Sequence, residues 1–179
     1  MHDFETDSPR LRFRRLRADD YAAIAPILQD AQTMYAWEHG FSYDEVCAFL
    51  ADQLRRYQAD GCGYFLALER ESGRTVGLAG PLLEHLGANE TAIGIGYIID
   101  RARWGQGFGA ECARTMLRYA REKLGAPRVV ALIRPENAAS LRVAAACGMN
   151  PVGQVVKHYR GKEMPHLLYT IDTAPPEAK

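Results

Sequence analysis

A glycine-rich loop between a strand pattern and a helix pattern constrains the fold of this chain more than any other feature. The loop reads Trp104-Gly105-Gln106-Gly107-Phe108-Gly109, after an apolar run at residues 96–99 and before a segment with apolar residues at helical spacing. Backbone N–H groups of such a loop can point at phosphate oxygens, and the start of a helix adds partial positive charge. Arg101 and Arg103 lie close by in the sequence. The segment therefore predicts a pyrophosphate-binding site.

Two other interpretations of the loop exist. A tight turn can need glycine only for its backbone dihedrals. Gly105, Gly107 and Ala110 also satisfy the G-x-G-x-x-G/A pattern of dinucleotide-binding folds. That pattern follows the first strand of its fold and needs an acidic residue at the end of the second, whereas here four strand patterns precede the loop and the next one ends at Arg134. A dinucleotide-binding domain therefore does not fit.

The order of the other patterns predicts a sheet covered by helices. Before the loop we expect a strand at residues 11–16 and a helix at 21–31 that is broken by Pro26. A second helix at 42–54 begins with the capping box Ser42–Glu45, and a meander of three strands follows at 64–69, 75–83 and 92–99. After the loop we expect a helix at residues 108–124, a buried strand at 129–133 and a short helix at 138–147 that is capped by Asn137. The two strands of a final hairpin follow at 151–158 and 166–171.

Length and charge narrow the classes of protein. A chain of 179 residues with 47% hydrophobic content suits one domain, which we place at residues 1–173, with a disordered tail at 174–179. Lysines plus arginines equal aspartates plus glutamates at 22 each, so no net charge favours a nucleic-acid partner. No apolar segment resembles a signal peptide or a membrane span. We therefore expect a cytoplasmic protein without a membrane or nucleic-acid partner.

The cysteines do not predict chemistry. Cys47, Cys62, Cys112 and Cys147 form no C-x-x-C pair, which argues against a zinc site and a redox motif. Three of them fall in helix patterns, where packing as small apolar side chains is the favoured interpretation. We predict reduced thiols and no metal.

Together with this order of elements, several short motifs carry a resemblance to a known family. They are Leu16-Arg17, Ile95-Gly96-Tyr97, the loop of residues 104–109, and Asn137-Ala138-Ala139-Ser140 followed by Gly148. The chain resembles the GNAT acetyltransferase superfamily over residues 11–172. A glutamine or arginine usually opens the family's loop, whereas Trp104 opens it here. This form resembles the branch that acetylates the N-terminal alanine or serine of ribosomal proteins.

The resemblance implies an α/β (α+β) fold with a mixed, mostly antiparallel sheet of six or seven strands, helices on both faces, and a V-shaped opening between two central parallel strands, 92–99 and 129–133. It implies acetyl-CoA as cosubstrate, with pantetheine pairing to the strand backbone. The implied cofactor-binding residues are Tyr97, Ile98, Ile99, Arg103, Trp104, Gly105, Gln106, Gly107, Phe108, Gly109, Ala110, Asn137 and Ser140. For Asn137 and Ser140, ordinary helix capping is an equal alternative.

Acetyl transfer needs a neutral amine, a stabilised oxyanion and a proton for the leaving thiolate, but no metal. A backbone N–H near Gly96 and Tyr97 is our hypothesis for the oxyanion contact. Many relatives carry a glutamate where this chain has Gly94. The general base is therefore open, with Glu84, His85 and Glu90 as candidates, and an α-amino acceptor can manage without a strong base. Tyr97 and Tyr159 are candidates for the general acid, with aromatic packing as the alternative.

The acceptor should lie against the first two helices and the final hairpin, because loops on a rigid sheet commonly form such sites. The candidate substrate-binding residues are Trp37, Glu38, His39 and His158. The acceptor can be a protein N-terminus or a small-molecule amine. Because Gly94 replaces the usual glutamate, a non-catalytic acyl-CoA-binding sensor or regulatory protein is the alternative function. The sequence allows a monomer or a homodimer.

Overall fold

The computed structural model describes residues 4–87 and 89–173. Its strands are β1 (Thr6–Asp7), β2 (Leu11–Arg15), β3 (Phe65–Glu69), β4 (Thr75–His85), β5 (Thr91–Ile99), β6 (Arg128–Ile133), β7 (Asn150–Tyr159) and β8 (Lys162–Asp172). Its helices are α1 (Tyr21–Leu28), α2 (Tyr43–Ala59), α3 (Phe108–Glu122) and α4 (Ala138–Ala146), with short 3-10 helices η1 (Tyr35–Trp37) and η2 (Arg101–Arg103).

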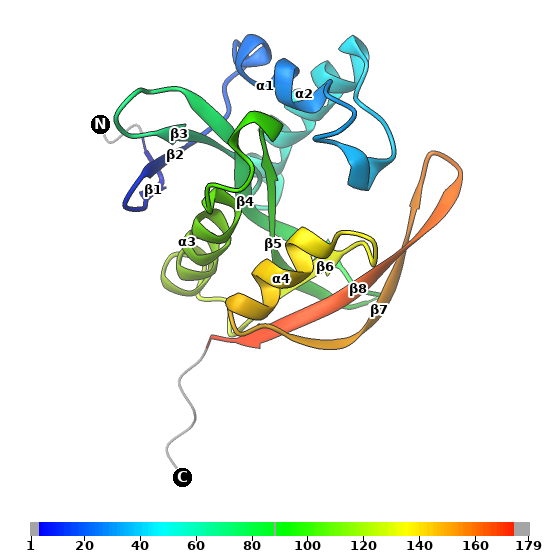
Figure 1. Ribbon diagram of the computed structural model, residues 1–179. Coiled ribbons are helices and arrows are strands. Elements are labelled where there is room, and N and C mark those ends of the chain that lie inside the picture. The colour runs from blue at the N-terminus through cyan, green and yellow to red at the C-terminus, as the bar shows by residue number, and fades with distance from the viewer. Residues whose placement is uncertain (1–3, 88, 174–179) are drawn as a thin grey trace.

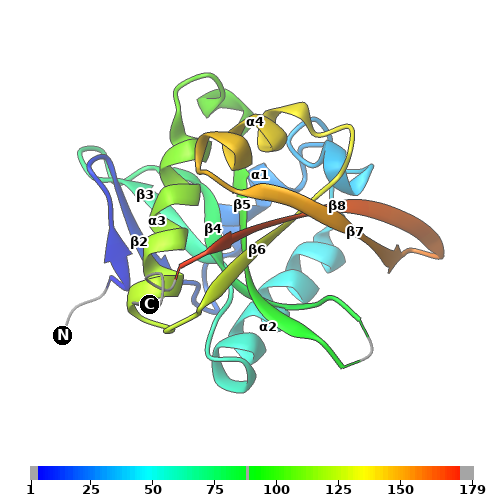
Figure 2. The same cartoon turned by 90° about the horizontal axis from the view of Figure 1, so that it is seen from below.

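All the strands belong to one eight-stranded sheet in the order β1-β2-β3-β4-β5-β6-β8-β7 (Figure 1). Helices α1 and α2 lie on one face of it, and α3 and α4 lie on the other, as the two views agree (Figures 1 and 2). The core forms where the apolar sides of these helices meet the sheet, for example at Ile24, Val46 and Met116, which are fully buried. The predicted fold class is confirmed.

The parallel pair β5 and β6 gives the sheet its opening. Along β4, β5 is paired over its whole length, from Gly77 opposite Ile99 to His85 opposite Thr91. Along β6, β5 is paired only at Ile93–Val129 and Gly94–Val130. Because β5 runs on to Ile99 after the two strands separate, every second residue among 95–99 presents its backbone N–H and C=O toward the gap, while the others pair with β4.

One local prediction was accurate and two needed correction. The capping box at the start of α2 is present, with the Ser42 hydroxyl accepting from the Glu45 N–H and the Glu45 carboxylate accepting from the Ser42 N–H. Helix α1 runs through Pro26 and ends at Leu28, so the proline precedes the end of the helix rather than dividing it. The sheet has eight strands rather than six or seven, because Thr6–Asp7 adds a short edge strand to β2.

The final hairpin is longer than predicted. It spans Asn150–Tyr159 and Lys162–Asp172 around a turn at Arg160 and Gly161, both with positive φ. Segments expected to be loop therefore belong to the sheet, and β8 begins four residues earlier than the pattern indicated. The predicted tail at residues 174–179 lies outside the described residues. Among the described helices, none is both long and apolar enough to cross a membrane.

Candidate active site

The glycine loop forms an anion-binding helix start. Gly105 and Gly107 have φ angles of 73° and 79°, which other residues adopt only with strain. Gly107 is also the N-cap of α3, and with no side chain it makes no side-chain capping bond. The first N–H groups of α3 therefore stay available to a ligand, at the positive end of the helix dipole. This arrangement fits a pyrophosphate.

Trp104 anchors the loop to the end of β5. Its indole Nε1 donates a hydrogen bond of 2.9 Å to the Ile99 carbonyl oxygen, and the ring packs edge-on to Tyr35 at a centroid distance of 6.2 Å. The ring is 46% exposed, so its indole body forms part of the surface beside the loop. Trp104 therefore has a positioning role that a small or charged residue cannot supply.

A first cavity of about 510 Å³ extends from this loop along β5. Every predicted cofactor-binding residue except Gln106 lines it, that is Tyr97, Ile98, Ile99, Arg103, Trp104, Gly105, Gly107, Phe108, Gly109, Ala110, Asn137 and Ser140. The Gln106 side chain instead donates to the Ala102 carbonyl oxygen. Sequence reasoning missed Tyr35 and Arg142, which also line this cavity from η1 and α4.

Asn137 combines the two roles that the sequence left open. Its Oδ1 accepts a hydrogen bond of 3.0 Å from the Ser140 N–H, which caps α4, and one of 2.5 Å from the Tyr35 hydroxyl. Asn137 and Ser140 nevertheless both line the cavity. Capping and cofactor contact are thus compatible at this position.

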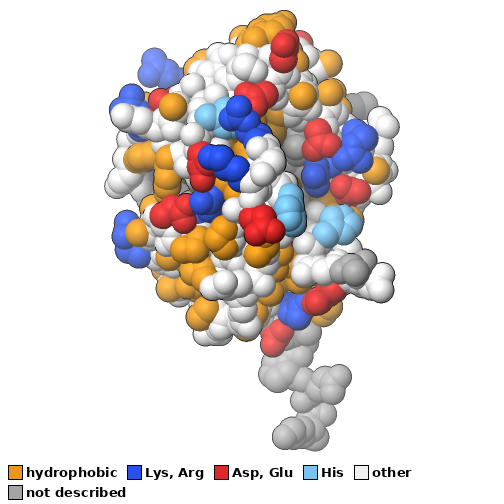
Figure 3. Space-filling model, turned by 90° about the vertical axis from the view of Figure 1, so that its right-hand side faces the viewer, with side chains coloured by type: hydrophobic (Ala, Val, Ile, Leu, Met, Phe, Trp, Pro, Cys, Tyr) orange, Lys and Arg blue, Asp and Glu red, His pale blue; other side chains and the backbone are white. Residues whose placement is uncertain are grey.

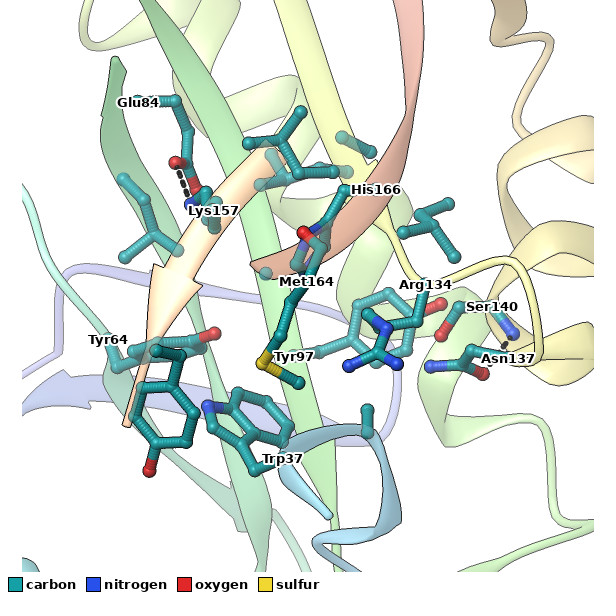
Figure 4. Close-up of a pocket in the computed structure, with 18 of the residues that line it drawn as sticks. Trp37, Tyr64, Glu84, Tyr97, Arg134, Asn137, Ser140, Lys157, Met164 and His166 are labelled. Carbon is teal, nitrogen blue, oxygen red and sulfur yellow. Dashed lines mark hydrogen bonds and ion pairs between the residues drawn. The ribbon is translucent and has the colours of Figure 1, made fainter. Parts of the chain in front are cut away.

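A second cavity, of about 860 Å³, lies on the side of α2 and the β7–β8 hairpin. Trp37, Tyr97, Asn137 and Ser140 line both cavities, so the two meet at the opening between β5 and β6. Figure 4 shows Glu84, Lys157 and His166 in the second cavity together with Arg134 and Tyr97. Figure 3 shows basic, acidic and histidine side chains interspersed on the side that carries the hairpin. No single charge dominates that surface.

Glu84 fills the space that a side chain at position 94 would need. A Cβ placed on Gly94 would lie 2.6 Å from the Glu84 Cγ, which is closer than real Cβ contacts allow. The Glu84 side chain is 14% exposed, and its Oε2 lies 2.6 Å from the Lys157 Nζ. A carboxylate from β4 therefore lies beside Gly94, the position at which the resemblance led us to expect a glutamate. His85 also lines the cavity, whereas Glu90 forms an ion pair of 2.9 Å with Arg128.

His166 is a candidate base that sequence reasoning missed. Its Nδ1 lies 2.9 Å from the Met164 carbonyl oxygen, so Nδ1 is the donor and Nε2 of the neutral ring remains an acceptor. Burial, together with the positive charges of Lys157 and Arg134, lowers the pKa of His166, although the bond to Met164 and the charge of Glu84 oppose this shift. The neutral form of the ring is therefore favoured at pH 7.

The two tyrosines proposed as general acids differ in setting. Burial raises the pKa of Tyr97 to about 12, and the nearby Ser140 hydroxyl offsets only part of this rise. Tyr97 borders both cavities, while Tyr159 lines only the second, beside the His39 ring at 6.1 Å. Burial also raises the pKa of Tyr159. Both phenols keep their protons at neutral pH.

The predicted acceptor residues do not all reach the cavities. Trp37 and His158 line the second cavity, whereas Glu38 and His39 are absent from both linings. Glu38 forms ion pairs with Lys162 at 2.8 Å and Arg134 at 3.4 Å, and these bonds lower its pKa. His39 is held between the Trp37 carbonyl oxygen and Glu45. Glu38 thereby links η1 to the hairpin tip, and His39 links η1 to α2.

Comparison with known proteins agrees with this architecture. The family model "Acetyltransferase (GNAT) domain" matches residues 10–150, and the chain belongs to this family. The chain is 33% identical over 142 residues to the protein YkkB of Bacillus subtilis (strain 168), described as uncharacterized, which covers 79% of this chain and 82% of that protein.

Two solved structures show the same fold. One is a putative ribosomal-protein-serine acetyltransferase from Vibrio cholerae, with a TM-score of 0.79, 23% identity, and coverage of 95% of this chain and 98% of that chain. The other is YncA, a putative acetyltransferase from Salmonella typhimurium with its cofactor acetyl-CoA, with a TM-score of 0.69, 21% identity, and coverage of 94% and 97%. The predicted resemblance to GNAT acetyltransferases is confirmed.

Proposed function

We propose that this protein transfers an acetyl group from acetyl-CoA to a primary amine in a ternary complex. The observation that carries the proposal is the meeting of two cavities at the gap between β5 and β6. One cavity begins at the N-terminus of α3, whose first N–H groups are available to a phosphate, and the other is lined by titratable side chains. A thioester in the gap is then within reach of an amine from the opposite side, which supports direct transfer without a covalent enzyme intermediate.

The residues along the first cavity supply binding and orientation. The N–H groups at the start of α3 hold the pyrophosphate, and the backbone of residues 95–99 pairs with the pantetheine amides as an added strand. Acetyl-CoA itself supplies the activated acetyl carbonyl. A free N–H at Gly96 or Tyr97 stabilises the negative charge that develops on the carbonyl oxygen.

Glu84 and His166 support the removal of the amine proton. The amine nitrogen forms a bond to the acetyl carbon, the carbon–sulfur bond breaks, and the nitrogen loses one proton to a base. The Glu84 carboxylate lies next to Gly94, where the two strands begin to separate, and the free Nε2 of His166 is an acceptor in the same cavity. We propose Glu84 as the base, directly or through a water molecule, with His166 as its alternative.

Tyr97 supports the return of a proton to sulfur. It borders both cavities and its raised pKa, about 12, keeps the phenol protonated, as a general acid requires. Tyr159 is the alternative acid, although it lines only the second cavity. The products are the acetylated amine and CoA with a free thiol.

The proposal is tested by ligand-dependent stability followed by turnover. Thermal unfolding is measured with acetyl-CoA, CoA or NAD, because a ligand at about 100 times its dissociation constant adds roughly 2.7 kcal/mol to stability. We expect a rise with acetyl-CoA and none with NAD, and then thiol release on addition of amines. The amine panel includes small-molecule amines and peptides with free N-termini, because the proposed function covers both classes of acceptor.

Two results would contradict the proposal in different ways. No stabilisation by millimolar acetyl-CoA would remove the cofactor assignment. Stabilisation without thiol release for any amine would instead favour an acyl-CoA sensor, a function that the ion pair between Glu84 and Lys157 also permits because it occupies the candidate base.

A further inference from the structure

Arg134 has hydrogen-bonding capacity that the described protein does not use. It directly follows β6, and its side chain is only 9% exposed. Its Nη2 contacts the carboxylates of Glu38 and Glu136, whereas Nε and Nη1 are buried and have no hydrogen-bond partner among the described residues. Buried donors without a partner are rare because they lose their hydration without compensation. Such a guanidinium calls for an acceptor group from outside the chain.

The position of Arg134 points to the amine-bearing substrate rather than to acetyl-CoA. Arg134 lines the second cavity, and it is absent from the lining of the first cavity at the glycine loop. Figure 4 shows its guanidinium directed between Trp37 and Asn137, on the same side as His166 and Met164. A group bound there shares the cavity with Glu84 and His166, the two candidate bases.

The acidic residues of this cavity already have partners. Glu84 is paired with Lys157, Asp52 with Arg55 and Arg56, and Glu45 with the Ser42 N–H and His39. Among the described lining residues, no carboxylate is thus left over for a second positive group on the acceptor. The unused donors belong to a guanidinium, whose N–H groups make their strongest hydrogen bonds to an anionic oxygen.

We propose that the acceptor is a small molecule with a carboxylate near its amine, and that Arg134 binds this carboxylate. The inference rests on the proposed acetyl transfer and specifies its substrate class. A planar guanidinium matches a carboxylate better than any neutral group, and charge-assisted hydrogen bonds of this kind are strong. Binding through Nε or Nη1 gives the buried donors the partner they lack. Arg134 is therefore a specificity residue that contacts substrate without taking part in proton transfer.

The first test compares matched acceptors. A panel of L-amino acids is assayed by thiol release at saturating acetyl-CoA, each beside its carboxamide and its decarboxylated amine. We expect kcat/KM for the preferred amino acid to exceed that of its amine by about 100-fold or more, since a site built to bond a polar group rejects analogues that lack it. Equal rates for the three members of each set, or turnover of amides and plain amines alone, would overturn the inference while leaving acetyl transfer intact.

The second test asks whether substitutions of Arg134 change the preference for an amino acid over its decarboxylated amine. Arg134→Gln should abolish the preference for the amino acid over its amine, mainly through KM, and Arg134→Lys should restore part of it because the charge returns without the planar fork. Arg128→Gln is the matched control, since Arg128 begins the same strand and pairs on the surface with Glu90. Stabilisation by acetyl-CoA, measured on each variant, verifies folding and cofactor binding. An unchanged preference in a folded Arg134→Gln variant refutes the assignment.

Discussion

The two cavities that meet at Tyr97 are built from different parts of the chain. The first contains the backbone groups of two glycines with positive φ, of an N-cap without a side chain and of the β5 edge beside the gap, together with side chains such as Tyr35 and Trp104. The second consists of side chains that arrive from α2, β4, β6 and the β7–β8 hairpin. Backbone geometry tolerates changes at neighbouring side chains, whereas a side-chain site changes with each substitution. One fold can therefore keep its cofactor and vary its acceptor.

The largest effect is expected at the glycine loop. Gly107→Val places a β-branched residue at a φ of 79° and disturbs the helix start, so acetyl-CoA binding should weaken by about 100-fold or more. Gly73→Val is the control, because Gly73 has a similar φ of 68° in the turn between β3 and β4, with open space around it. Thermal shift with acetyl-CoA measures both. A similar loss of affinity in the two variants would mean that general strain, not the loop, is responsible.

The next largest effect is expected at Glu84, the proposed base in the second cavity. Glu84→Gln removes the carboxylate but keeps the shape, and we expect kcat/KM for the amine to fall about 100-fold while the KM for acetyl-CoA is unchanged. Glu90→Gln, on the surface beside Arg128, should leave both constants unaltered. If Glu84→Gln retains full activity and His166→Gln does not, the proton acceptor is His166.

A pH profile distinguishes the two bases further. Burial lowers the pKa of His166, so its ring loses its proton below the ordinary value near 6.5. If His166 is the base, kcat should rise with pH through a limb below about 6.5 and then level off, and the limb should disappear in His166→Gln. Replacement of Lys157 by Met, which removes a positive charge near the ring, should move that limb to higher pH.

A smaller effect is expected at the residue shared by both cavities. Tyr97→Phe should lower kcat by about 10- to 100-fold with little change in stability, since the ring is retained and only the hydroxyl is lost. Because the pKa of Tyr97 is raised to about 12, the wild-type rate should show no alkaline loss from this phenol below about pH 10. Tyr159→Phe is the matched comparison, and the larger loss identifies the acid.

The smallest effect is expected from a substitution at the start of α2, which tests whether this helix influences the second cavity alone. Ser42→Ala removes the capping box and should lower the free energy of unfolding by about 1 kcal/mol. Because α2 lines only the second cavity, any rise in KM should concern the amine and not acetyl-CoA. Chemical denaturation and steady-state kinetics measure the two quantities. A rise in the KM for acetyl-CoA would show that the two cavities are not independent.

The contrast between the cavities also explains what the sequence could predict. Gly105, Gly107 and Asn137 act within a few residues of their own position, so a linear pattern carries their role. Arg134, Lys157 and His166 meet only because β6, β7 and β8 are neighbours in a particular register. His166 was expected at the start of its strand, yet β8 begins at Lys162 and carries it into the cavity. Register is a property of tertiary pairing, which the local pattern does not contain.

The short pairing between β5 and β6 has a mechanical consequence. The ladder joins strands β1 to β5 with strands β6 to β8 only at Ile93–Val129 and Gly94–Val130. In the free protein the two parts of the sheet are thus joined by a short stretch of strand pairing, and a molecule bonded along residues 95–99 would extend that pairing. The amide protons in this stretch that are not hydrogen-bonded to β4 should exchange quickly in the free protein and slowly when acetyl-CoA is bound. Under the proposed function, acetyl-CoA would thus be a temporary part of the sheet, and release of CoA would return the β5–β6 contact to its two residue pairs.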